Sequence, residues 1–122
     1  PKSQTSIISI NLYCQIDNIS FNNGNYLISY DEVEYHKSEN LEITIQNEKI
    51  ELIEKQISDS SKIVMQTLNY DEFGNHKFNE QVSLKKFQSL FSDTEFERYK
   101  HIPFKIKITD DQVISIEEIY IP

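Results

Sequence analysis

Apolar and polar residues alternate along much of this chain, and the alternation predicts β-strands. The clearest run covers residues 8–16, where every second position is apolar: Ile8, Ile10, Leu12, Cys14 and Ile16. A period of two places these side chains on one face of a strand, so we expect a strand with one buried face.

The next segment predicts a hairpin. Residues 22–25, Asn-Asn-Gly-Asn, tolerate positive φ, so the first strand is expected to turn back into residues 26–36 as its antiparallel partner. In this second strand the apolar phase changes midway, from Tyr26, Ile28 and Tyr30 to Val33 and Tyr35. The change predicts a β-bulge near Asp31 and Glu32, which would keep an inward face on both sides.

Two further alternating runs predict more strands. The third run comprises Leu41, Ile43 and Ile45, followed by a turn at residues 47–49 before Ile50 and Leu52. The fourth starts with Ile63, Met65 and Thr67 in residues 62–70 and leads through a polar corner to Gly74. We therefore expect the sheet to continue beyond the first hairpin.

The apolar period then changes to that of a helix. Apolar residues recur at helical spacing with Ser83 placed as N-cap: Leu84, Phe87, Leu90 and Phe91. Thr94 and Glu97 resemble a capping box, which predicts a second helical turn that Pro103 ends. Residues 103–121 resume the period of two on both sides of Asp110-Asp111-Gln112, so they predict a closing hairpin.

This order of elements predicts the fold class. Several strands, a helix and a final hairpin follow one another as in a small Greek-key barrel of the OB type, in which the helix plugs one end. We expect a mostly β domain, a barrel of five to seven antiparallel strands with one short helix before the last hairpin. Barrel closure requires apolar inner faces, which explains the aliphatic character of residues 103–122.

Size and charge narrow the range of functions. The 122 residues suit a single domain, 1–122, with one core, and we expect a monomer. No stretch approaches the roughly 18 consecutive apolar residues of a membrane span, and residues 1–6 lack the features of a signal peptide, although a leader could have been removed. The formal net charge of −8 repels nucleic acids and anionic membranes, so nucleic acid is an unfavourable partner.

Three segments resemble those of a known group of proteins. They are residues 33–35 (Val-Glu-Tyr), residues 83–87 (Ser-Leu-x-x-Phe) and residues 103–122 (Pro-Phe-x-Ile-x-Ile, turn, Val-x-x-Ile-Glu-Glu-x-Tyr-x-Pro). Together they resemble a group of small bacterial β-rich proteins, often secreted or lipid-anchored, of unassigned function. The resemblance implies a compact domain outside the cytoplasm and no particular activity.

The sequence contains few residues in patterns typical of catalysis or metal binding. The single cysteine, Cys14, falls on the inward phase of its strand, which favours a core residue over a nucleophile. His36, His76 and His101 lack the spacing of a zinc motif, so a metal site would have to be assembled from loops. With two glycines in the chain there is no phosphate loop, and we expect neither a cofactor nor enzymatic activity.

Two surfaces are candidates for binding. The bulge is expected to aim Tyr30, Glu32, Glu34 and Tyr35 outward, and we predict that these four residues contact a ligand. The second candidate is a basic, aromatic segment, residues 85–107, which holds six basic and three acidic residues. Such a segment is typical of barrels that bind single-stranded nucleic acid, with exposed tyrosines as stacking platforms.

We therefore expect a non-enzymatic binding or interaction module of the bacterial envelope or of a secreted protein, with an unknown protein partner. One alternative is an acidic inhibitor or immunity-type protein that docks on a basic protein, which the charge of −8 supports. A second alternative is an OB domain that binds single-stranded nucleic acid.

Overall fold

The computed structural model describes residues 9–37, 43–46 and 51–121. Its elements follow the chain in this order: β1 (Ser9–Asn22), β2 (Asn25–Lys37), β3 (Ile43–Gln46), β4 (Leu52–Met65), β5 (Glu80–Val82), α1 (Leu84–Ser92), the 3₁₀ helix η1 (Thr94–Lys100), β6 (Pro103–Thr109) and β7 (Gln112–Glu118).

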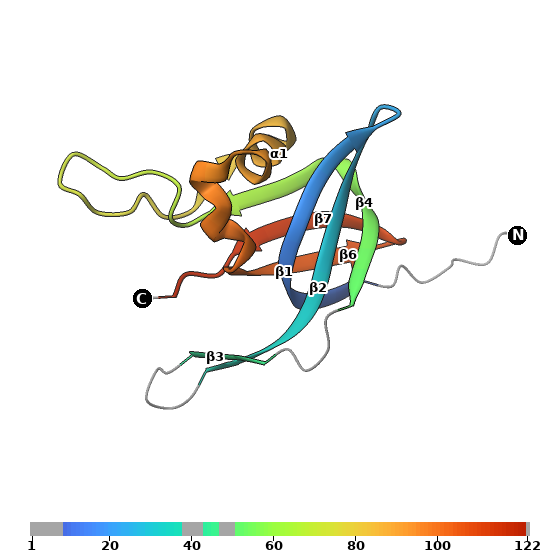
Figure 1. Ribbon diagram of the computed structural model, residues 1–122, viewed down its shortest axis with the longest axis horizontal. Helices are drawn as coiled ribbons and strands as arrows, with labels where there is room; N and C mark the ends of the chain where they lie inside the picture. The colour runs from blue at the N-terminus through green and yellow to red at the C-terminus, as the bar shows by residue number, and fades with distance from the viewer. Residues whose placement is uncertain (1–8, 38–42, 47–50, 122) are drawn as a thin grey trace, which may run out of the picture.

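Five of these strands form a closed barrel (Figure 1). β1 pairs with β2 and β6, β6 with β7, β7 with β4, and β4 with β2. Both helices lie between β4 and β6 in the chain, so the predicted mostly β, OB-like barrel is confirmed. The predicted antiparallel pairing has one exception, because β4 and β7 are parallel. A closed ring of five strands cannot alternate in direction throughout, so one neighbouring pair must be parallel.

Two tight turns join the barrel strands that follow each other directly. Asn23 and Gly24 have φ values of 52° and 82°, and Asp110 and Asp111 have φ values of 51° and 64°. Two consecutive residues with positive φ make the turn whose twist matches that of the flanking strands. Both hairpins predicted from the sequence are therefore present, and both turns occupy predicted positions.

The bulge lies in a different strand from the one predicted. Ile16 pairs with Tyr30 and Asn18 pairs with Ser29, so Asp17 is an extra residue in β1. β2 instead pairs regularly with β4 as far as Asp31. The apolar phase of β2 changes where its pairing with β4 ends, since Tyr30, Asp31 and Val33 are all buried, and residues 34–37 then pair with β3.

β4 combines two runs that the sequence analysis treated separately. It is one strand of fourteen residues, and its register against β7 shifts between Ile57 and Lys62. The polar residues 58–61 occupy this irregularity, where Ser61 Oγ donates a hydrogen bond to the Val113 carbonyl at 2.7 Å. The predicted strand start at Leu41, the turn at 47–49 and Ile50 lie outside the described residues.

The helices cover one end of the barrel. Ser83 caps α1 as predicted, since its Oγ accepts a hydrogen bond from the Lys86 amide at 3.1 Å. η1 is capped by Asp93 and not by Thr94, because the Asp93 carboxylate accepts a hydrogen bond from the Glu95 amide at 3.0 Å. The N-cap is therefore one residue earlier than the predicted Thr94, while the second helical segment itself is present.

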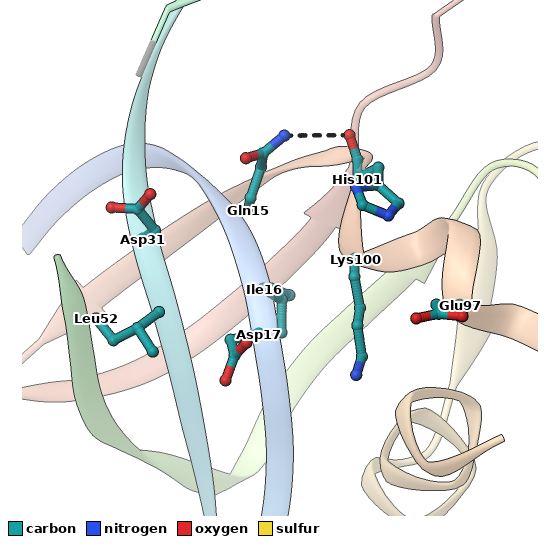
Figure 2. Close-up of a pocket in the computed structure, with 8 residues that line it drawn as sticks. All are labelled: Gln15, Ile16, Asp17, Asp31, Leu52, Glu97, Lys100 and His101. Atoms are coloured by element: carbon teal, nitrogen blue, oxygen red, sulfur yellow. Dashed lines mark hydrogen bonds between the residues drawn. The ribbon is translucent and has the colours of Figure 1, made fainter. Parts of the chain in front are cut away.

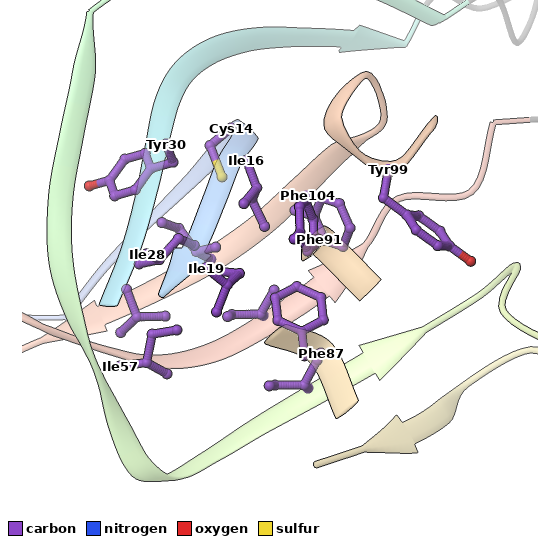
Figure 3. Close-up of a cluster of buried hydrophobic side chains, with 14 of the residues drawn as sticks. Cys14, Ile16, Ile19, Ile28, Tyr30, Ile57, Phe87, Phe91, Tyr99 and Phe104 are labelled. Carbon is purple, nitrogen blue, oxygen red and sulfur yellow. The ribbon is translucent and has the colours of Figure 1, made fainter. Parts of the chain in front are cut away.

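The core fills the space between the barrel and the helices. Figure 3 shows Phe87 and Phe91 of α1 near Phe104 of β6, and the ring centroids of Phe87 and Phe91 are 5.1 Å apart. Cys14 is fully buried, as its phase predicted. Ile10, predicted to share that buried face, is 52% exposed, because it lies near the start of β1.

Candidate functional site

Exposed aromatic side chains gather at one end of the barrel. Residues 66–79 connect β4 to β5 as a loop that projects beside α1, close to where the chain leaves β7 (Figure 1). The aromatic end, as we call it, consists of Tyr70, Phe73, His76, Phe78 and Tyr120. Tyr70 is 59% exposed, Phe73 80%, Phe78 48% and Tyr120 39%. Large rings with this exposure do not contribute to the core.

Four of these rings contact one another around His76. The ring centroid of His76 lies 4.7 Å from Tyr70, 5.8 Å from Phe78 and 5.7 Å from Tyr120, and Phe78 lies 5.0 Å from Tyr120. The last three pairs are edge-to-face, an arrangement that aromatic quadrupoles favour. The contacts join the loop to the segment after β7, so the two form one surface.

Hydrogen bonds fix the tip of the loop. The Asp71 carboxylate accepts hydrogen bonds from the amides of Phe73 and Asn75 at 2.8 and 2.9 Å. Gly74 has a φ of 83°, which glycine adopts without a Cβ penalty. Tyr70 and His76 face each other in an isolated β-bridge. Phe73 is therefore displayed on a turn whose shape the backbone and one carboxylate define.

A buried carboxylate holds the base of the loop. Glu118, 1% exposed, accepts hydrogen bonds at Oε1 from the amides of Gln66 and Thr67, at 2.7 and 3.0 Å. Its Oε2 accepts a third from the Thr67 hydroxyl at 2.5 Å. β4 ends at Met65, and Glu118 thus replaces the sheet partner that these two amides lose. Since a buried polar group without a partner is costly, this arrangement fixes where the loop departs.

Arg98 of η1 holds the same threonine from another direction. Its Nη1 donates to Thr67 Oγ1 at 3.1 Å, and its Nη2 donates to the Thr67 carbonyl at 2.8 Å and to the Tyr99 hydroxyl at 2.9 Å. The guanidinium also lies 4.3 Å from the centre of the Tyr99 ring. Burial raises the pKa of Tyr99, an effect that the positive charge of Arg98 partly offsets.

A cleft of about 410 Å³ lies beside this network. Tyr70, His76 and Tyr120 line it together with Arg98 and Glu118. Among the described residues, the buried Nδ1 atom of His76 has no hydrogen-bond partner. The cleft therefore has aromatic walls, whereas most of its charged groups are already engaged in holding the loop.

A second groove, of about 290 Å³, follows the bulge in β1 (Figure 2). Asp17 of β1 and Lys100 of η1 both line this groove, and Figure 2 shows the Lys100 side chain extending alongside β1. Gln15 Nε2 donates to the His101 carbonyl at 3.2 Å, and Asp31 accepts a hydrogen bond from the Glu51 amide at 3.0 Å. The groove is lined by charged groups of both signs and by Ile16 and Leu52, but by no Phe, Tyr or Trp side chain, so it lacks the aromatic walls of the cleft.

The predicted ligand-binding residues do not form one surface. Tyr30 is 2% exposed, so its prediction as an exposed contact is wrong: it lies on the inner face of β2, opposite Ile16 and Ile53. Burial raises the pKa of Tyr30 to about 12. Tyr35 stacks against Tyr13 with ring centroids 4.7 Å apart. Glu32 and Glu34 are exposed, and no described cleft is lined by either.

The residues considered for nucleophilic or metal chemistry are also dispersed. Cys14 is inaccessible, and burial raises the pKa of its thiol, with a smaller contribution from Asp31 and Glu32. His76 belongs to the aromatic end and His101 to the groove, while the side chain of His36 is outside the described part of the chain. No group of three or more His, Cys, Asp or Glu side chains in the described ranges could hold a metal ion.

The basic segment does not form a continuous strip. Tyr99 is fully buried, Arg98 is engaged by Thr67, and Lys105 lies opposite Glu117 in the β6–β7 register. Lys85 and Lys86 are exposed on α1, as expected for the polar face of that helix.

The sequence matches no family model, no curated protein and no solved structure. The resemblance to small secreted or lipid-anchored proteins accordingly stays a prediction. In the described ranges, neither helix has the length and apolar character needed to cross a membrane.

Sequence reasoning missed the aromatic end, although part of the signal was present. Residues 70–78 contain Tyr70, Phe73 and Phe78 among polar residues and Gly74, without a period of two or of 3.6. The spacing of rings in an aperiodic, turn-rich segment does not assign them to a buried face. Such rings are therefore candidates for exposed contacts. The burial of Glu118 beside an exposed Glu117 had no comparable signal in the sequence.

Proposed function

We propose that this protein is a non-enzymatic binding module that docks a protein partner on its aromatic end. The observation that carries the proposal is the exposure of Tyr70, Phe73 and Phe78 on a loop anchored by Glu118 and Arg98, next to the exposed Tyr120 after β7. Exposed aromatic side chains gathered in one place mark interaction surfaces, and aromatic residues dominate the binding energy of protein interfaces.

The anchoring of the loop supports this proposal. A partner pays an entropic cost when it orders a mobile loop, and that cost is smaller where the loop is already held in its bound shape. Glu118 and Arg98 fix the base of the loop, Gln66 and Asn79 hydrogen-bond across it at 2.9 and 3.0 Å, and Asp71 fixes its tip. The rings are thus presented without a further ordering step.

The face that OB barrels use for nucleic acid has the wrong charge in this protein. That face lies on the second and third barrel strands, here β2 and β4, and on the turns beside them. Asp110 and Asp111 form one of these turns, and Lys55 of β4 offsets the charge of Asp111, but Glu32 of β2 and Glu54 of β4 are also exposed. This acidity, with the net charge of −8, favours a protein partner over single-stranded nucleic acid.

The proposal is tested by using the purified protein as bait in extracts of its source organism, including the envelope fraction. The test variant combines Tyr70→Ser and Phe73→Ser, and the control is Phe21→Ser, which alters a ring that is 55% exposed in β1. We expect the wild-type protein and the control to retain one partner that the double variant loses at least tenfold. Equal retention by the double variant, or loss only in the control, would contradict the proposed surface.

A further inference from the structure

Acidic side chains accompany the exposed rings. The loop and β5, residues 66–82, contain Asp71, Glu72 and Glu80 but only one basic residue, Lys77. Glu72 is exposed and directly precedes Phe73. A ligand that approaches the rings therefore meets carboxylates first, in a protein whose net charge is already −8.

The one guanidinium beside the cleft is poorly placed to receive an anion. Both Nη atoms of Arg98 already donate to Thr67, and Nη2 also donates to Tyr99. A carboxylate or phosphate binds arginine best through two parallel N–H groups, which here would require release of these partners. Arg98 thus serves as an anchor for the loop.

These observations identify the chemistry of the partner. We propose that the aromatic end receives a basic protein segment whose lysine or arginine side chains lie over the rings of Tyr70 and Phe73. Cations are attracted to the faces of aromatic rings, and the carboxylates of Asp71 and Glu72 add to that attraction. The inference rests on the proposed function, because it assigns a charge to the partner of that same surface.

The cleft supplies the apolar part of the same contact. Its walls include Ile102, Ile119 and Ile121 besides the aromatic rings, and its volume of about 410 Å³ falls within the usual range of ligand pockets. An apolar side chain from the partner fits a cleft whose charged groups are engaged by Thr67. The partner segment therefore alternates basic residues for the rim with an apolar residue for the cleft.

The inference is tested with three capped synthetic pentapeptides, Arg-Leu-Arg-Leu-Arg, Gln-Leu-Gln-Leu-Gln and Glu-Leu-Glu-Leu-Glu. Each is titrated into the whole isotope-labelled chain, and amide shifts are followed by NMR. We expect the basic peptide to shift residues 70–78 and 119–121 and to bind at least tenfold more tightly than the other two. Its affinity should fall between 50 and 500 mM salt, because exposed charges are screened.

Two charge variants sharpen the test. Glu72→Lys should weaken binding of the basic peptide about two- to five-fold, in the range of exposed ion pairs. Glu54→Lys makes the same charge change on β4, within the stretch that pairs with β2, and should leave the affinity within about twofold of wild type. Equal affinity for all three peptides, or an equal effect of the two variants, would overturn the basic-partner inference.

The outcomes separate this inference from the proposed function. If the natural partner depends on Tyr70 and Phe73 but binds equally well at low and high salt, the basic-partner inference fails and the proposed function stands. If the partner is retained by the Tyr70→Ser, Phe73→Ser variant, the proposed function fails, and the inference fails with it.

Discussion

Two groups of aromatic rings occupy opposite environments in this protein. Phe87, Phe91 and Phe104 are at most 5% exposed, whereas Phe73 and Phe78 at the aromatic end are 80% and 48% exposed. The buried rings come from a helix and a strand with regular periods, and the exposed ones come from a loop without a period. The difference shows that the position of a ring in the fold, and not the residue type, determines whether it stabilises the fold or remains exposed.

The largest effect is expected where a core ring is removed. Phe104→Ala should lower the free energy of unfolding by about 3–5 kcal/mol, because it removes buried apolar area and leaves a cavity between α1 and the barrel. Urea unfolding followed by circular dichroism measures this loss. Phe21→Ala, at an exposed position, is the control and should stay within about 0.5 kcal/mol. A loss below about 1 kcal/mol for Phe104→Ala would show that this part of the core is loosely packed.

The next effect concerns Tyr30, whose burial raises its pKa to about 12. An unfolded tyrosine ionises near pH 10. The contribution that the raised pKa of Tyr30 makes to the free energy of unfolding is therefore fully present below about pH 10. Between about pH 10 and 12 the unfolded state loses this proton first, and stability should fall by about 1.4 kcal/mol per pH unit. Urea unfolding at pH 9, 10 and 11 measures the slope.

A variant separates Tyr30 from the other titrating groups. Tyr30→Phe should flatten the alkaline decline but not abolish it, because burial also raises the pKa values of Cys14 and Tyr99. If the free energy of unfolding falls with the same slope between pH 10 and 11 in wild type and variant, Tyr30 ionises as an exposed tyrosine does. Burial would then not raise its pKa.

A smaller effect is expected at the base of the loop. Glu118→Gln should cost about 1–3 kcal/mol, because a neutral amide cannot replace a carboxylate that accepts three hydrogen bonds. Hydrogen exchange should become faster at the amides of Gln66 and Thr67. Exchange in the core strands should change only as much as the change in global stability requires. The neighbouring variant Glu117→Gln is the matched control, since Glu117 is exposed. Equal stability of the two variants would exclude Glu118 as an anchor.

The smallest effect on stability is expected at the tip of the loop. Phe73→Ser should change the free energy of unfolding by less than about 0.5 kcal/mol, because the ring is 80% exposed. The same variant should weaken partner binding, whereas Phe21→Ser should leave both stability and partner binding close to wild type. Denaturant unfolding of the purified variant provides the comparison, and a loss above about 1 kcal/mol would place Phe73 among the structural rings.

The sequence predicted those parts of the fold in which apolar residues recur with a regular period. Alternation identified β1, the hairpin partner in β2 and the closing β6–β7 hairpin, and helical spacing identified α1 with its Ser83 cap. The two turns followed from residues that tolerate positive φ. These features are local, because neighbouring residues alone determine them.

The remaining features depend on contacts between distant segments. The bulge at Asp17 is defined by the register of β1 against β2, and the exposure of Tyr30 could not be judged without β4 beside it. The anchor at the aromatic end joins Thr67, Arg98 and Glu118, which are at least twenty residues from one another. A single sequence shows no period that links such positions, so the sequence analysis placed its candidate contacts on β2 and did not identify the aromatic end.

The parallel pair of β4 and β7 has a consequence for biosynthesis. β7 is the last described strand to be made, and it both closes the barrel and carries Glu118 to the loop after β4. While β7 is still absent, the nascent chain lacks both the β4–β7 pairing and the Glu118 hydrogen bonds to the loop. Pairings between segments that are distant in sequence form slowly. A nascent chain that has not yet incorporated β7 therefore lacks an ordered aromatic end, so the binding surface that we propose can form only after β7 has been made.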